Sequence, residues 1–253
     1  RLQKLAKILE DTLEIDEILK LAADASEVQA AEPRISFHLE KTVRIGVAED
    51  EAFCFYYKDN FRLLKSMGAE LVTFSPMRDE HLPENLKGLI LGGGYPELNA
   101  RELEANVSMR EDIHRALNDG MPCLAECGGF MYLHDEMEAM DGNSYHMAGV
   151  ISGRAYRTQR LNRFGYVTLT QKKEVLGMND MGGIRAHEFH YFDSENCGDD
   201  FDAKKPASHR KWNCIHGTDT MMAGFPHLYF YGNPKVPEAF LRKCSQYGRQ
   251  DAR

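Results

Sequence analysis

Between residues 43 and 126, short apolar runs alternate with stretches in which apolar residues recur at helical spacing. The apolar runs are rich in glycine and aliphatic residues, as expected of strands that are buried on both faces of a parallel sheet. They predict strands at Val43–Ala48, Leu71–Phe74, Gly88–Leu91 and Met121–Leu124, with helices at about 57–67 and 100–117 between them. This alternation predicts an α/β fold built on a doubly wound, mostly parallel sheet.

The N-terminal segment has a different pattern. Apolar residues recur at helical spacing from Leu2 to Leu9, and Asp16 is a suitable cap for a further helix, so residues 1–31 predict two helices. Residues 30–42 contain a proline and have the character of a linker. The large α/β domain is therefore expected to begin at residue 43.

Beyond residue 142 the pattern changes to the alternation of polar and apolar residues that is typical of antiparallel strands. We expect such strands at 154–158, 166–170 and 184–192, followed by a polar, turn-rich insertion at 196–209. A strand at 221–224 and a helix at 237–243 complete the expected fold, which is an α/β domain with an antiparallel extension.

The composition narrows the classes of function. A net charge of −8 and a sequence pI of about 5.7, with no local basic patch, argue against a nucleic-acid partner. Six cysteines without regular spacing do not indicate a disulfide framework, and we recognise neither a signal peptide nor an apolar run of membrane-spanning length. We therefore expect a cytoplasmic protein that binds neither nucleic acid nor a membrane.

Residues 125–129, Ala-Glu-Cys-Gly-Gly, follow a predicted strand and have the pattern of a nucleophile elbow. The small residues allow a strained turn that lifts the side chain of Cys127 above the sheet, at the start of a helix whose dipole favours a thiolate. The alternative is a buried, inert cysteine before an ordinary glycine turn.

The glycines 92–94 follow another predicted strand and expose backbone N–H groups that no side chain shields. Together with the N–H of Gly128, they could form an oxyanion hole for acyl chemistry at Cys127. The alternatives are a phosphate-binding turn and a plain tight turn. A Walker A loop is absent from the chain because Gly-Lys-Ser/Thr does not occur.

A cysteine nucleophile needs a base, and the chain has ten histidines. His187 and His190 are three residues apart, which on a strand places them on opposite faces, and Cys214 and His216 lack two further well-placed ligands. We therefore expect no metal site. His227 follows the last predicted strand, where catalytic loops of α/β sheets gather, but it could equally be a packed core histidine.

Five segments, in this order, match a known family: Glu49–Asn60, Leu91–Leu98, Ala125–Gly129, His187–Tyr191 and His227–Pro234. The chain resembles the glutamine amidotransferase domains of cobyrinic acid a,c-diamide synthases, which belong to the class I glutaminases and have a flavodoxin-like sheet. The resemblance implies that residues 43–253 form the glutaminase domain. It also implies that residues 1–42 are a helical remnant of the synthetase domain with a linker.

The same resemblance implies site residues. Cys127 would be the nucleophile and His227 its base, with backbone groups of Gly93, Gly94 and Gly128 in the oxyanion hole. Many class I glutaminases have a glutamate two residues after the histidine, where this chain has a tyrosine. Glu188 is a possible substitute for that orienting acid.

The resemblance also implies partners. Glutamine would be the substrate, and the ammonia would pass to a synthetase domain, in cis or in trans, that carries cobyrinic acid and uses ATP and Mg²⁺. No cofactor is expected in this chain itself, which would be a fragment or a short homologue working with a separate synthetase. A homodimer is possible.

Three alternatives stay open at this point. The acceptor could be a related macrocycle, such as Ni-sirohydrochlorin or hydrogenobyrinate. An elbow cysteine on such a sheet could also serve a peptidase or a thiol-stress protein. Finally, the chain could be a glutaminase-like module that binds glutamine or a partner without turnover.

Overall fold

The computed structural model describes residues 1–29 and 35–248. The chain divides into two compact units, residues 1–34 and 35–253. Residues 30–34 of the expected linker lie outside the described part of the chain. The assignment of residues 1–42 to a synthetase remnant stays a prediction.

The first unit contains two helices, α1 (Leu2–Thr12) and α2 (Ile15–Ala23), where the sequence predicts two. The expectation that Asp16 caps the second helix is wrong, because α2 begins at Ile15 with Glu14 in the cap position. Asp16 lies in the first turn, where its negative charge interacts favourably with the helix dipole.

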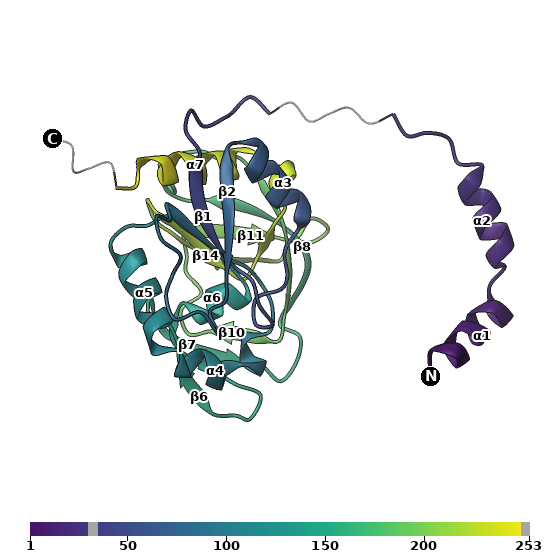
Figure 1. Cartoon of the computed structure of the whole chain (residues 1–253), viewed down its shortest axis with the longest axis horizontal. Coiled ribbons are helices and arrows are strands. Elements are labelled where there is room, and N and C mark those ends of the chain that lie inside the picture. The colour runs from purple at the N-terminus through teal and green to yellow at the C-terminus, as the bar shows by residue number, and fades with distance from the viewer. Residues whose placement is uncertain (30–34, 249–253) are drawn as a thin grey trace. The chain divides into compact units, whose positions relative to one another are not determined.

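The second unit is built on a six-stranded sheet with the order β2-β1-β3-β4-β14-β13 (Figure 1). Its strands are β1 (Val43–Ala48), β2 (Ala69–Phe74), β3 (Gly88–Leu91), β4 (Cys123–Glu126), β13 (His216–Gly217) and β14 (Met221–Gly224). All neighbours are parallel except β13, which is antiparallel to β14. The order of the five parallel strands is that of flavodoxin-like doubly wound folds, so the expected fold class is confirmed.

Helices cover both faces of this sheet, and in Figure 1 the strands β14, β1 and β2 lie between α5 and α3. The helices are α3 (Lys58–Ser66), α4 (Ala100–Ala105), α5 (Val107–Asn118), α6 (Gly128–Tyr132) and α7 (Lys235–Gln246), with 3₁₀ turns at Pro96–Leu98 and Phe230–Gly232. Successive residues of β3 point to opposite cores: Leu89 packs with Ile113 of α5, whereas Ile90 packs with Leu63 of α3. Both cores consist of buried apolar side chains, one on each face of the sheet.

Two further sheets form the extension, which is antiparallel as expected except that β5 pairs with β7 in parallel. One has the order β10-β7-β5-β6 and the other the order β12-β11-β8-β9-β15. Their strands are β5 (His134–Glu138), β6 (Ser144–His146), β7 (Ile151–Arg157), β8 (Arg163–Gln171), β9 (Ile184–His190), β10 (Phe192–Ser194), β11 (Phe201–Lys204), β12 (Lys211–Cys214) and β15 (His227–Leu228). The second of these sheets is antiparallel throughout and brings β15 against β9.

Two expected elements differ in the structure. The helix expected at 100–117 is interrupted at Asn106, whose side chain donates hydrogen bonds to the carbonyl groups of Pro76 and Asp79 at 2.9 and 2.8 Å. The backbone of Asn106 leaves the helical region, with φ −84° and ψ 71°, so α4 ends before it and α5 begins after it. The insertion at 196–209 contains β11, a strand that the polar composition of the segment conceals.

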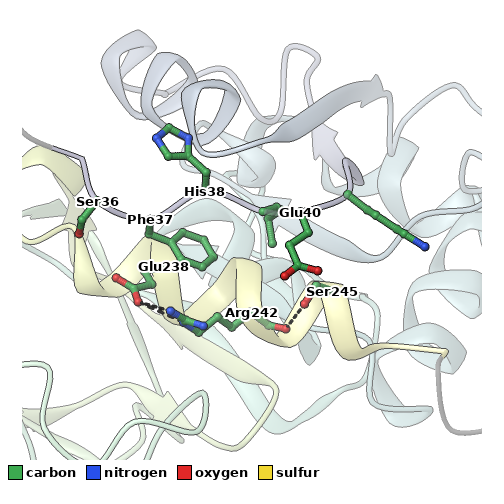
Figure 2. A pocket seen from close by; sticks show the side chains of 9 residues that line it. Ser36, Phe37, His38, Glu40, Glu238, Arg242 and Ser245 are labelled. Carbon is green, nitrogen blue, oxygen red and sulfur yellow. Dashed lines mark hydrogen bonds and ion pairs between the residues drawn. The ribbon is translucent and has the colours of Figure 1, made fainter.

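Residues 35–42, part of the expected linker, belong to the second unit and pack against its other elements. The N–H of Leu39 donates to the carbonyl of Met67 at 2.9 Å, and the guanidinium of Arg242 lies 4.5 Å from the centre of the Phe37 ring. Figure 2 shows this segment above α7, where the two line a surface pocket. No helix among the described residues has both the length and the apolar character needed to cross a membrane.

Candidate active site

Three segments that are far apart in the sequence meet at the carboxyl edge of the central sheet. β3 runs into Gly92–Gly94, β4 ends immediately before Cys127, and β14 leads to His227. These three strands are direct neighbours in the order β3-β4-β14. Open α/β sheets bind their ligands outside this edge, so the topology itself gathers the candidate residues.

Cys127 occupies the strained turn between β4 and α6. Its φ and ψ are 49° and −101°, and a positive φ is uncommon for a residue with a side chain. The turn is held from both sides, because the N–H of Cys127 donates to Gly224 at 2.8 Å and that of Gly129 donates to Gly92 at 2.8 Å. A Cβ atom at Gly129 would lie 2.0 Å from the carbonyl oxygen of Leu91, so only glycine fits there. This is the geometry of a nucleophile elbow.

His227 begins β15 and is 6% exposed. Its ring meets the ring of Phe55 at a centroid distance of 4.8 Å, and a Cβ atom built at Gly93 would lie 2.5 Å from its Cε1 atom. The backbone that follows it is clamped by Asn60, which donates to the carbonyl of Leu228 at 2.7 Å and accepts from the N–H of Phe230 at 2.8 Å. The imidazole is therefore held by packing on one side and by backbone on the other.

Glu126 lies beside the base. Its Oε2 is 3.4 Å from Nδ1 of His227, and its Oε1 accepts a hydrogen bond from the N–H of Leu228 at 3.2 Å. Burial lowers the pKa of His227, but hydrogen bonds and opposite charges from Cys127 and Glu126 outweigh it and raise this pKa to about 10. The imidazole therefore keeps its proton at neutral pH, where it faces the carboxyl group of Glu126 and the sulfur of Cys127.

The glycine amides lie in two environments. Gly93 forms an isolated antiparallel bridge with Phe55 and packs against the imidazole of His227. Gly94 instead approaches the start of α6: its nitrogen lies 3.1 Å from a Cβ atom built at Gly128. Among the described residues, neither Gly94 nor Gly128 donates its N–H to an acceptor. These two adjacent N–H groups remain available to a ligand oxygen.

Cys127 and His227 open into one cavity of about 430 Å³. Its wall is mainly apolar and aromatic, as in many small-molecule sites. The lining residues are Cys54, Phe55, Gly94, Tyr95, Glu97, Cys127, Met131, His187, Phe189, His190, Tyr191, Phe192 and His227. Of the predicted site residues, the structure thus brings the cysteine, the histidine and the glycine loops together.

Glu188 lies elsewhere. It is fully buried on β9, where its Oε1 accepts from the indole N–H of Trp212 at 3.3 Å and its Oε2 lies 3.5 Å from Nε2 of His190. The carboxylate at the His227 ring is that of Glu126, which sequence reasoning missed as a functional residue. Its position directly before the cysteine was visible in the motif, but that position alone does not reveal which side chain it faces.

The described residues contain no group of three or more histidine, cysteine, aspartate or glutamate side chains that could hold a metal ion. His187 and His190 differ in exposure, as their spacing on β9 leads one to expect: His190 is buried and His187 is half-buried. Nε2 of His216 is hydrogen-bonded to the carbonyl of Asn196 at 2.8 Å.

The order of the parallel strands and the turn at Cys127 define a flavodoxin-like α/β fold with a nucleophile elbow at the carboxyl edge of its sheet. The chain is similar in fold to a crystal structure described as glutamine amidotransferase (TM-score 0.53, 17% identity, 79% of this chain and 98% of the other covered). It is also similar to PurLQS from Thermotoga maritima (TM-score 0.55, 16% identity, 81% and 98% covered).

The chain belongs to the family of CobB/CobQ-like glutamine amidotransferase domains, whose sequence profile matches residues 44–234. It is 36% identical over 252 residues to a cobyrinate a,c-diamide synthase of Caldanaerobacter subterraneus, with 99% of this chain and 55% of that protein covered. It is 39% identical over 241 residues to the protein of the same name from Clostridium acetobutylicum, with 92% and 52% covered. The chain thus spans about half the length of these curated relatives.

Proposed function

We propose that the chain hydrolyses glutamine as the glutaminase part of a cobyrinate a,c-diamide synthase. The observation that carries this proposal is the pairing of Cys127, on a strained elbow, with a protonated His227 in one cavity beside free N–H groups. This arrangement suits acyl transfer from an amide to a thiol. The names of the relatives support the choice of acceptor.

In the first step, the thiolate of Cys127 attacks the side-chain amide carbon of glutamine and forms a C–S bond. The negative charge moves to the carbonyl oxygen, which accepts hydrogen bonds from the N–H groups of Gly94 and Gly128. Each such donor contributes about 3–4 kcal/mol to the stability of the transition state. The C–N bond then breaks, and the imidazolium of His227 donates its proton to the departing nitrogen, which releases ammonia.

In the second step, the neutral imidazole of His227 takes a proton from water while the water oxygen attacks the glutamyl thioester. The C–S bond breaks, glutamate leaves, and the thiolate–imidazolium pair is restored. The sum is glutamine and water giving glutamate and ammonia. Ammonia is a nucleophile only while it is unprotonated, and a mainly apolar cavity wall would favour this neutral form.

The ammonia would react with carboxylates that a synthetase domain has activated with ATP and Mg²⁺. The relatives are about twice as long as the matched region, which leaves room for such a domain in the same polypeptide. We infer that the a and c carboxylates of cobyrinic acid are the acceptors. Assaying cobyrinic acid beside hydrogenobyrinic acid and Ni-sirohydrochlorin would distinguish the acceptor macrocycles.

The test replaces the nucleophile in the full-length protein. Cys127→Ala should abolish glutamate release and covalent labelling by a glutamine-analogue electrophile, while amidation with added ammonia continues. Cys54→Ala, which removes another thiol from the same cavity wall, should leave all three activities unchanged. Glutamate release by a folded Cys127→Ala variant would refute the proposal.

A further inference from the structure

The residue directly before the nucleophile presents its carboxylate to the base. Nδ1 of His227 is a buried ring nitrogen without a well-formed hydrogen bond, and the oxygen that faces it is Oε2 of Glu126 at 3.4 Å. The distance is that of an ion pair, slightly long for a hydrogen bond. Catalytic hydrogen bonds in ligand-free sites are often long and shorten when substrate binds.

The two other candidate groups have different partners. Two residues after His227, the hydroxyl of Tyr229 lies 3.5 Å from a carboxylate oxygen of Asp59, on an exposed part of the surface. Glu188 faces Trp212 and His190. Neither group is aimed at the imidazole of His227, so Glu126 is the carboxylate that meets it among the described residues.

The backbone fixes Glu126 in this orientation. The residue ends β4, and its neighbour in the sheet is Gly224 of β14. Its second oxygen accepts the N–H of Leu228, the residue that follows the base. One carboxylate therefore holds both the ring and the backbone of the His227 segment, and it cannot rotate away without losing a hydrogen bond.

We propose that Glu126 is the positioning residue of this active site, which orients His227 through Nδ1 and leaves Nε2 for proton transfer at Cys127. This inference rests on the proposed glutaminase function. The sequence departs here from the arrangement in which the acid follows the histidine by two positions. An acid at that other position would approach from the strand of the base, whereas Glu126 approaches from the strand of the nucleophile.

The charges around His227 decide how the site responds to pH. The titratable groups that face it are Cys127 and Glu126 and, across the pairing of β15 with β9, His187. Glu126 in turn raises the pKa of Tyr57, although burial is the larger cause. Glu126 is one of the groups that raise the pKa of His227, so removing its negative charge lowers this pKa and the imidazolium is lost at a lower pH.

The test compares Glu126→Gln, Glu126→Asp, Glu188→Gln and Tyr229→Phe in the full-length protein. Glu126→Gln should lower kcat for glutamine at least about tenfold with little change in KM. It should also change the pH profile of the alkylation of Cys127 by iodoacetamide, because the imidazolium of His227 is then lost at a lower pH than in the wild type. Glu126→Asp keeps the charge and should restore part of kcat and of the pH profile. Tyr229→Phe should match the wild type.

Three results would overturn the proposal. The first is a folded Glu126→Gln variant with wild-type kcat and pH profile. The second is the same loss in Glu188→Gln instead. The third is a Glu126→Asp variant no better than Glu126→Gln. The proposed function is tested separately, by glutamate release in the wild type and its loss in Cys127→Ala. A wild-type-like Glu126→Gln variant would therefore refute the role of Glu126 and leave the proposed function standing.

Discussion

The contact between Gly93 and the imidazole of His227 allows a quantitative prediction. A Cβ atom at Gly93 would lie 2.5 Å from Cε1 of His227, whereas ordinary van der Waals contacts begin at 3.4 Å. In Gly93→Ala the ring must therefore move by about 1 Å. It cannot do so freely, because Phe55 packs on the ring and Glu126 faces Nδ1.

A misplacement of about 1 Å in a catalytic group can lower the rate about 100-fold, which corresponds to about 2.7 kcal/mol of barrier. We expect Gly93→Ala to lower kcat/KM for glutamine by about this factor. Glutamate release by the full-length protein measures the effect, and amidation with added ammonia, which bypasses the glutaminase site, should continue at the wild-type rate. Labelling of Cys127 by a glutamine-analogue electrophile should slow in parallel.

Gly232→Ala is the matched control. A Cβ atom there meets its nearest neighbour, the ring of Tyr229, at an ordinary 3.9 Å. This variant should keep its activity and its unfolding transition. The reasoning fails if Gly93→Ala, with a wild-type unfolding transition, hydrolyses glutamine at the wild-type rate.

Three further predictions concern stability and pH. Tyr56→Phe leaves the N–H of Gly92 without its 2.9 Å acceptor, so the free energy of unfolding in urea should fall by about 1–3 kcal/mol; an unchanged midpoint would contradict this. Asn60→Ala leaves two buried backbone groups unpaired and should lower it by about 2–3 kcal/mol, and calorimetry should show a lower Tm. The raised pKa keeps His227 charged up to about pH 10. From neutral pH to about pH 10, iodoacetamide should therefore alkylate Cys127 faster in the wild type than in His227→Asn, and above that pH the two rates should be equal. Equal rates at pH 7 would argue against an ion pair.

Much of the fold was predictable because its signals are local. Buried parallel strands are nearly continuous apolar runs, and each of the four expected before residue 127 is present within a few residues of its expected ends. The predicted helix at 100–117 was wrong at a position that the spacing of apolar residues does not mark. At the break between α4 and α5, the side-chain amide of Asn106 binds backbone of another loop, a contact that no spacing rule contains.

The site was predictable in part. The glycines that follow Cys127 predict a strained turn, and the structure contains this turn. Glycine is needed there because a Cβ atom would contact neighbouring atoms too closely. Glu126 was missed because its role depends on two contacts over 100 residues away in the chain, one to the ring of His227 and one to the N–H of Leu228. Glu188 is also a glutamate next to a candidate histidine in the sequence, yet its register on β9 directs it to Trp212.

By itself, the sequence determined the parallel strands before residue 127, the strained elbow and the glycine loops, because these follow from side-chain size, branching and periodicity over a few neighbouring residues. Only the tertiary structure decided which acid meets the imidazole. That choice depends on the order of β3, β4 and β14 in the sheet and on the pairing of β15 with β9, which arise from packing two apolar cores across the whole domain.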